Sequence, residues 1–417
     1  MPTTNALKLA CIGGGTGLSS LLSGLKQYTR AKHDNSEIID MDNLAAIVSV
    51  SDDGGSSGRL VQEFDVLPPG DIRKLLFTLS EADEWLSNLF EYRFPSKGDL
   101  GGHTVGNLLL TALTDLEGGN FPQAIEAASR LLAVRERIIP VSLDYTVLCA
   151  KLDDDEIVRG ESYIPDRTNR APIQHVFFEP RESGKNQHRP KAPYECLAHE
   201  EASEAIRNSD VIIIGPGSLY TSIMPNLVVK GIVDAINASD AMKIYICNVM
   251  TQPGETDGYS VTDHVDAILN HADIALDYII VNNKVAPEEV IEQYVHRALS
   301  EQFARIKSLT EEGFFMLDEE SEQPVDVPSV LEVTKQISLL ADKTEQVSDA
   351  SKVQVFYDRA QEHLEDKGIE VIEADLIVVR DIGEVGTPWN VIRHEPEQLA
   401  RTLIKVLGNH PKLHEPV

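Results

Sequence analysis

Cysteine is scarce in this 417-residue chain, which contains four, all far apart in the sequence. No two of them have the Cys-x-x-Cys spacing of a redox motif or of half a zinc site. Cys11 and Cys247 lie inside apolar runs typical of buried strands, whereas Cys149 and Cys196 have no cysteine close by. We therefore expect reduced, buried thiols rather than a disulfide framework, and no zinc site.

Long apolar runs and an excess of basic residues are also missing. No stretch reaches the roughly 18 apolar residues that a membrane-spanning helix needs, so no membrane insertion is expected. The first residues, Met-Pro-Thr-Thr-Asn, show no basic segment followed by an apolar one, so a cytoplasmic protein is expected. The 37 Lys and Arg residues face 67 Asp and Glu residues, giving a net charge of −30. Because such a surface repels polyanions, nucleic-acid binding is disfavoured.

Glycine, by contrast, is concentrated in several loops, and the first of these is the one around which the chain is organised. Residues 8–22 are typical of a short apolar strand, a Gly-Gly-Gly-Thr-Gly loop at 13–17 and a helix. The glycines let the backbone approach a ligand closely, and the first amides of the helix favour a phosphate or another anion. Leu18 stands where a P-loop has its Lys and where the dinucleotide motif has its third glycine, so neither motif applies. A tight turn without a ligand is the alternative. The candidate residues of this loop are Gly13, Gly14, Gly15 and Thr16.

Two carboxylates follow the next apolar strand. Residues 44–50 run into Ser-Asp-Asp-Gly-Gly-Ser-Ser-Gly at 51–58. In an open parallel sheet the ligand lies beyond the carboxyl ends of the strands, so this loop should face the first one. We favour Asp52 and Asp53 as ligands of ribose hydroxyls or of Mg²⁺, against the alternative that they only form an Asx-type turn.

A third glycine-rich stretch, Gly-Gly-His-Thr-Val-Gly-Asn at 101–107, precedes a helical pattern. His103 and Asn107 are four residues apart and share one face if the helix begins early. A single histidine near a helix start is more often structural, but the surrounding glycines favour a ligand site at these two residues.

The strand-to-glycine-loop unit then recurs. An apolar strand at 210–214 ends in Gly-Pro-Gly-Ser, and a strand at 243–247 is followed by a polar segment, 248–259, that contains Thr251. Because the loops after parallel strands can meet at a switch point of the sheet, we predict one diphosphate pocket between the two glycine loops. This prediction adds Gly215, Gly217, Ser218 and Thr251 to the candidate ligand-binding residues.

The order of strands and helices predicts an α/β fold: a doubly wound, mostly parallel, Rossmann-like sheet with helices on both faces. Between 138 and 180 the connections are too short for crossover helices, which favours a small antiparallel β section. Residues 302–349 are acidic and lack periodicity. We interpret them as a peripheral insertion into one domain formed by residues 1–301 and 350–417.

Together the motifs resemble the family that joins 2-phospho-L-lactate transferases (CofD-like) with bacterial gluconeogenesis factors (YvcK-like). The resemblance covers about residues 6 to 295 and 352 to 407, and its Ser-Asp-Asp-Gly-Gly-Ser-Ser-Gly and Gly-Glu-Thr-Asp-Gly-Tyr stretches are near the wording of the gluconeogenesis-factor branch. The remaining segments that carry it are 13–17, 69–71, 102–107, 215–218 and 393–394.

Membership in that branch implies a cytoplasmic factor needed for cell shape and cell-wall synthesis on gluconeogenic carbon sources, binding UDP-sugars such as UDP-N-acetylglucosamine. A Tyr and an Arg matter for that binding, and the motifs place them at Tyr259 and Arg393. The transferase branch implies instead a Mg²⁺-dependent transfer of a phospholactyl group onto a deazaflavin, with an acidic pair at Asp52 and Asp53 and Arg93 as a candidate basic residue. We prefer the non-catalytic binding factor and keep the transferase as the alternative. No cofactor is certain, and a homo-oligomer is compatible with the sequence.

Overall fold

Seven parallel strands form the central sheet of the computed structural model, which describes residues 6–31, 38–167, 169–181, 194–296, 353–360, 362–381 and 390–414. Every neighbouring pair of strands is parallel. The acidic insertion predicted at 302–349 lies outside the described residues. In spatial order the strands are β10 (Glu370–Ala374), β9 (Tyr278–Asn282), β8 (Met242–Ile246), β7 (Val211–Ile214), β1 (Leu7–Gly13), β2 (Ile39–Val48) and β3 (Arg137–Pro140).

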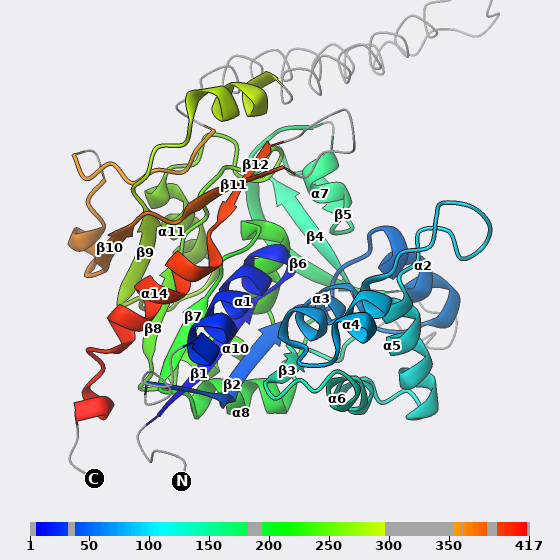
Figure 1. Ribbon diagram of the computed structural model, residues 1–417. Helices are drawn as coiled ribbons and strands as arrows, with labels where there is room; N and C mark the ends of the chain where they lie inside the picture. Colours follow the sequence, from blue (N-terminus) through cyan, green and yellow to red (C-terminus); the bar gives the residue numbers. More distant parts are fainter. Residues whose placement is uncertain are drawn as a thin grey trace, which may run out of the picture.

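Two hydrophobic cores cover the two faces of this sheet, as the alternation of side chains along β1 requires. Leu9 and Cys11 point into one core and Ala10 and Ile12 into the other. The predicted doubly wound α/β fold is confirmed. On the first face lie α1 (Gly15–Ala31), α3 (Gly70–Leu79), α6 (Phe121–Leu131) and α14 (Pro396–Leu407), with α1 and α14 side by side (Figure 1). On the second lie α8 (Glu200–Arg207), α9 (Met224–Leu227), α10 (Ile232–Asn237) and α11 (Val261–His271).

Smaller elements surround this framework. The predicted antiparallel section exists as a three-stranded sheet in the order β5-β4-β6, and β11 pairs with β12 in a second antiparallel sheet. These strands are β4 (Thr146–Leu152), β5 (Ile157–Arg159), β6 (Ile173–Pro180), β11 (Ile377–Asp381) and β12 (Asn390–His394). Further helices are α2 (Gly55–Phe64), α4 (Glu84–Glu91), α5 (Val105–Leu116) and α7 (Tyr163–Asp166), and shorter turns include the π-helical η2 (Leu219–Ile223) and the 3₁₀ turns η4 (Leu364–Lys367) and η5 (Pro411–His414). No helix within the described ranges is long and apolar enough to cross a membrane.

The four cysteines confirm the expectation drawn from their spacing. All are free and buried, and none pairs with another. Burial raises the pKa of the Cys11 and Cys247 thiols to about 12, so both stay protonated and unreactive near neutral pH.

The order of the sheet reverses between β1 and β7. From β1 the chain proceeds to β2 and β3 on one side, whereas β7, β8, β9 and β10 extend on the other. A crevice forms at the carboxyl ends of two such strands because their outgoing connections diverge to opposite faces of the sheet. The functional site is therefore expected at the ends of β1 and β7.

Helix α1 packs so closely on α14 that there is no room for a side chain at Gly24, where the two helices meet. A Cβ atom on Gly24 would lie 2.0 Å from the backbone carbonyl oxygen of Pro396. Alanine is preferred over glycine in a helix by about 1 kcal/mol, but overpacking typically costs about 1 to 3 kcal/mol or more where backbone must move. We expect Gly24→Ala to lower the free energy of unfolding by about 2 kcal/mol in urea denaturation.

The matched control is Gly408→Ala, at the end of α14, where the nearest atoms to an added Cβ are 3.4 Å away or more. We expect this variant to stay within about 0.5 kcal/mol of the wild type. If Gly24→Ala were as stable as the control, the α1–α14 interface would be able to accommodate a Cβ atom with little loss of stability.

Candidate functional site

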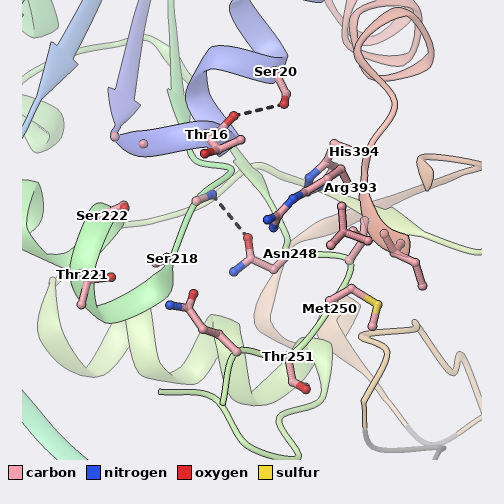
Figure 2. A pocket seen from close by; sticks show the side chains of 18 of the residues that line it. Thr16, Ser20, Ser218, Thr221, Ser222, Asn248, Met250, Thr251, Arg393 and His394 are labelled. Carbon is pink, nitrogen blue, oxygen red and sulfur yellow. Dashed lines mark hydrogen bonds between the residues drawn. The ribbon is translucent and has the colours of Figure 1, made fainter. Parts of the chain in front are cut away.

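A cavity of about 740 Å³ lies at the predicted edge of the sheet, beyond the ends of β1, β7 and β8 (Figure 2). Its lining comes from the two glycine loops, from the segment 248–253 after β8, from β12 and from the start of α3. The volume lies within the range of small-molecule sites, and most of the side chains that line it are polar.

The glycine loops after β1 and β7 touch each other. A Cβ atom on Gly17 would lie 2.4 Å from the carbonyl oxygen of Pro216 and 2.7 Å from the amide nitrogen of Gly217. The carbonyl oxygen of Gly13 accepts a hydrogen bond from the side-chain amide of Asn226, 3.1 Å away. The predicted meeting of the two loops is thus confirmed, and the close approach explains why glycine stands at position 17.

A carboxylate of the protein occupies the anion position at the start of α1. Oδ2 of Asp71 accepts a hydrogen bond of 2.9 Å from the amide of Gly15, and its Oδ1 lies 3.1 Å from Nζ of Lys74. A helix N-terminus attracts negative charge, so this buried carboxylate takes the place that the sequence assigned to a ligand phosphate. Sequence reasoning missed Asp71 as a site residue, although it lies in the Pro-Gly-Asp segment that carries part of the family resemblance.

The two adjacent carboxylates of the 51–58 loop separate in the structure. Asp52 lines the cavity, and its Oδ1 accepts a hydrogen bond of 3.0 Å from the amide of Gly54, as in the Asx-type turn considered as the alternative. Asp53 instead accepts a hydrogen bond of 2.9 Å from the amide of Ser162. Within the described ranges, no group of three or more His, Cys, Asp and Glu side chains is placed to hold a metal ion. A Mg²⁺ role for Asp52 and Asp53 stays a prediction.

Four carboxyl groups line the cavity, and three of them interact electrostatically with one another. Burial, followed by the charge of Asp71, raises the pKa of Asp52. Burial and the charges of Asp52 and Asp71 raise the pKa of Glu161 well above its ordinary value, while its Oε2 accepts a hydrogen bond of 2.5 Å from the hydroxyl of Ser51. We call Asp52, Asp71, Glu161 and Asp166 the acidic wall.

Hydroxyl and amide groups form the floor of the cavity. Ser218, Thr221 and Ser222 line it from the turn around η2, and Asn248 accepts a hydrogen bond of 3.3 Å from the amide of Gly217. Thr251 also lines the cavity, while its hydroxyl donates to the carbonyl oxygen of Val353, 3.0 Å away. The predicted residues Ser218 and Thr251 therefore share one cavity with Gly14, Gly15, Thr16 and Gly217.

Arg393 brings a positive charge to the cavity. Figure 2 shows its guanidinium reaching from β12 toward the space between Thr16 and Asn248. Within the described part of the lining, the only other cationic side chain is Lys74, which pairs with Asp71. The next residue, His394, is buried and donates through Nε2 to the carbonyl oxygen of Cys247, 3.1 Å away, which ties β12 to the end of β8. Burial lowers the pKa of His394 to about 4, so it is neutral at physiological pH.

The remaining sequence candidates do not line this cavity. The hydroxyl of Tyr259 lies 3.0 Å from that of Tyr220, and its ring stands edge-on to His264. His103 and Asn107 are buried and converge on the hydroxyl of Ser56, at 2.9 and 3.0 Å, where they join α5 to α2. Arg93 donates to the carbonyl oxygen of Gly102, 2.7 Å away. Gly13 and Gly215 belong to the two glycine loops but do not line the cavity. Direct ligand contacts by these residues stay predictions.

A family model described as 2-phospho-L-lactate transferase CofD matches residues 9–321. The chain belongs to the CofD family. The family resemblance seen in the motifs is thereby confirmed, including the blocks that contribute both glycine loops.

Proteins named gluconeogenesis factor or putative gluconeogenesis factor are among the relatives of similar sequence. That of Bacillus subtilis is 43% identical over 288 residues, covering 69% of this chain and 82% of the relative. A putative gluconeogenesis factor of Thermoanaerobacterium thermosulfurigenes is 36% identical over 405 residues, covering 97% and 98%. A crystal structure of a Bacillus halodurans protein superposes with a TM-score of 0.70 at 33% identity, covering 97% of this chain and all of that one. The last comparison supports the same α/β fold independently.

Proposed function

We propose that this protein is a cytoplasmic nucleotide-sugar binding factor of the gluconeogenesis-factor branch, taking UDP-N-acetylglucosamine or a related compound, and that it acts in cell shape and cell-wall synthesis during gluconeogenic growth. One observation carries the proposal: the guanidinium of Arg393 faces two touching glycine loops across a polar cavity of nucleotide-sugar size. The names of the relatives, gluconeogenesis factor and putative gluconeogenesis factor, support the gluconeogenic part of this role.

The charges of the cavity suggest how such a ligand lies. A diphosphate is repelled by the acidic wall but attracted by Arg393 and by the amides and hydroxyls of the floor. Sugar hydroxyls, in contrast, are donors that carboxylates accept well. We therefore place the diphosphate beside Arg393 and Ser218, and the sugar hydroxyls toward Asp71 and Asp52.

Asp71 sets the affinity for a bare nucleotide in this arrangement. Its carboxylate holds the Gly15 amide and repels phosphate, so we expect Asp71→Asn to bind UDP about fivefold more tightly, an effect of about 1 kcal/mol typical of charges at helix ends. The gain for UDP-N-acetylglucosamine should be smaller, because a sugar hydroxyl then loses its carboxylate acceptor. Titration calorimetry with both ligands measures the difference. Asp234→Asn, an equal change of charge on the exposed surface of α10, is the control. Weaker UDP binding by Asp71→Asn would place the diphosphate elsewhere.

The description of the matching family model, a 2-phospho-L-lactate transferase, favours a second candidate. The family resemblance implies that such an enzyme transfers a phospholactyl group onto a deazaflavin with Mg²⁺. Mg²⁺ often binds through one or two carboxylates together with substrate phosphates, so Asp52 and Asp71 are the residues of this cavity that fit it. When bound, such an ion supplies charge neutralisation at a transferring phosphoryl group. The protein's own residues would then position the two substrates, with Arg393 holding the phosphate.

Mass spectrometry of small molecules carried through native purification separates the two candidates. We expect a nucleotide sugar from the wild type and none from Arg393→Ala purified in parallel. Recovery of a deazaflavin from the wild type instead would favour the transferase.

A further inference from the structure

A buried carboxylate lies directly beneath the floor of the cavity. Glu255 is 4% exposed, and its Oε2 accepts a hydrogen bond of 3.1 Å from the amide of Tyr220. Its Oε1 accepts a hydrogen bond of 3.0 Å from the hydroxyl of Thr221 and another from the side-chain amide of Gln252. Both Thr221 and Gln252 line the cavity. The protonation state of Glu255 therefore affects two groups that a ligand would touch.

The chemistry of these contacts depends on one proton. All three neighbours donate, which suits an ionised carboxylate. Thr221 has a single hydroxyl proton, and while that proton is donated to Glu255 only its lone pairs remain for the cavity. A carboxyl group protonated on Oε1 would donate to Thr221 instead, leaving the Thr221 proton available for an oxygen of a bound phosphate.

We propose that Glu255 determines whether Thr221 presents a hydrogen-bond acceptor or donor to the cavity, so that binding of a diphosphate is accompanied by proton uptake at Glu255. This inference rests on the proposed function, because it concerns a diphosphate at the same floor. It makes Glu255 a positioning residue, acting on the ligand through Thr221.

The groups around Glu255 allow this proton to move near neutral pH. Burial raises the pKa of Glu255 to about 7, against the hydrogen bonds from Thr221 and the Tyr220 amide and the charge of Arg167, which lower it. Asp257, beside Gly254, adds negative charge near Arg167. The Tyr220 and Tyr259 hydroxyls have raised pKa values and stay neutral. A bound anion raises the pKa of Glu255 further, so protonation and anion binding reinforce each other as the pH falls through about 7.

Calorimetry of UDP-N-acetylglucosamine binding, run at pH 6 to 8 in buffers of different ionisation enthalpy, gives both the affinity and the protons taken up. The disubstituted diphosphate of this probe does not titrate in that range. Asp52 and Glu161 also have raised pKa values and line the cavity, so the difference between the wild type and Glu255→Gln isolates Glu255. The glutamine keeps an acceptor for the Tyr220 amide and donates to Thr221, as the protonated carboxyl group would.

For the wild type we expect roughly fivefold weaker binding at pH 8 than at pH 6, with proton uptake near pH 7.5. Glu255→Gln should bind at pH 8 nearly as tightly as at pH 6 and take up fewer protons. Thr221→Val, which keeps the shape of the side chain without the hydroxyl, should also show a weaker pH dependence. Equal proton uptake by the wild type and Glu255→Gln, or an unchanged pH dependence in Thr221→Val, would overturn the inference. Absence of binding by the wild type at every pH would overturn the proposed function, and this inference with it.

Discussion

Replacing Arg393 with alanine should weaken binding of UDP-N-acetylglucosamine about 100-fold, because hydrogen bonds from a charged group contribute about 1.5 to 3 kcal/mol and two of them can join a guanidinium to one phosphate. The guanidinium faces the glycine loops from β12, and the other cation of the described lining, Lys74, is paired with Asp71. Titration calorimetry at low and moderate salt measures the loss.

Two further variants locate the effect. Arg401 lies on α14 and pairs with Glu397 outside the cavity, so Arg401→Ala should leave the affinity unchanged. Arg393→Lys keeps the charge without the planar pair of donors and should recover only part of the affinity. Near-wild-type affinity in Arg393→Ala would leave β12 with a structural role alone.

Replacing Gly15 with valine should abolish measurable nucleotide binding in a protein that remains folded. Gly15 has a φ angle of +60°, a conformation that a β-branched residue adopts only at a cost above about 1 to 2 kcal/mol. Its amide is the first of α1, and the nearest obstacle to a Cβ atom is the Ser222 hydroxyl at 3.5 Å. The strain, rather than a clash, is therefore expected to move the loop, and differential scanning calorimetry with and without UDP-N-acetylglucosamine shows both effects.

Gly368→Val is the matched control for this strain. Gly368 has a φ angle of +78° after η4, nothing lies within 4 Å of an added Cβ, and it does not line the cavity. We expect a comparable loss of thermal stability with unchanged ligand affinity. Equal affinities in the two variants would remove the first glycine loop from the site.

The framework of the site was predictable because it follows from local sequence. Apolar strands ending in glycine loops fix where β1 and β7 stop, and the alternation of strands and helices fixes the parallel sheet that brings Gly17 and Gly217 together. Ser218 and Thr251 could be placed for the same reason, since they follow β7 and β8 directly.

The acidic wall and the support beneath the floor were not predictable in this way. Asp71 and Glu161 reach the cavity from α3 and from the turn after β5, and only the tertiary packing of these elements decides which carboxylates face inward. Glu255 lies in the same sequence motif as Tyr259, which carries part of the family resemblance. Its hydrogen bond with Thr221, however, joins two loops 34 residues apart, and the local sequence does not indicate such a contact.

Tertiary contacts also override local helix propensity near the C-terminus. Residues 358–367 have a sequence pattern typical of a helix, whereas the described residues of this segment contain only the short turn η4. Glu362 instead accepts hydrogen bonds from the amide and the hydroxyl of Thr262 at the start of α11. These long-range contacts fix the chain in a conformation that the local pattern does not show.

Titration of the purified wild-type protein with UDP-N-acetylglucosamine, followed by competition with UDP, measures whether the cavity binds a nucleotide sugar. We expect saturable binding at one site per chain, competition by UDP, and loss of both signals in Arg393→Ala. Failure of UDP-N-acetylglucosamine to bind the folded wild-type protein, or competition that persists unchanged in Arg393→Ala, would show that this cavity is not the nucleotide-sugar site.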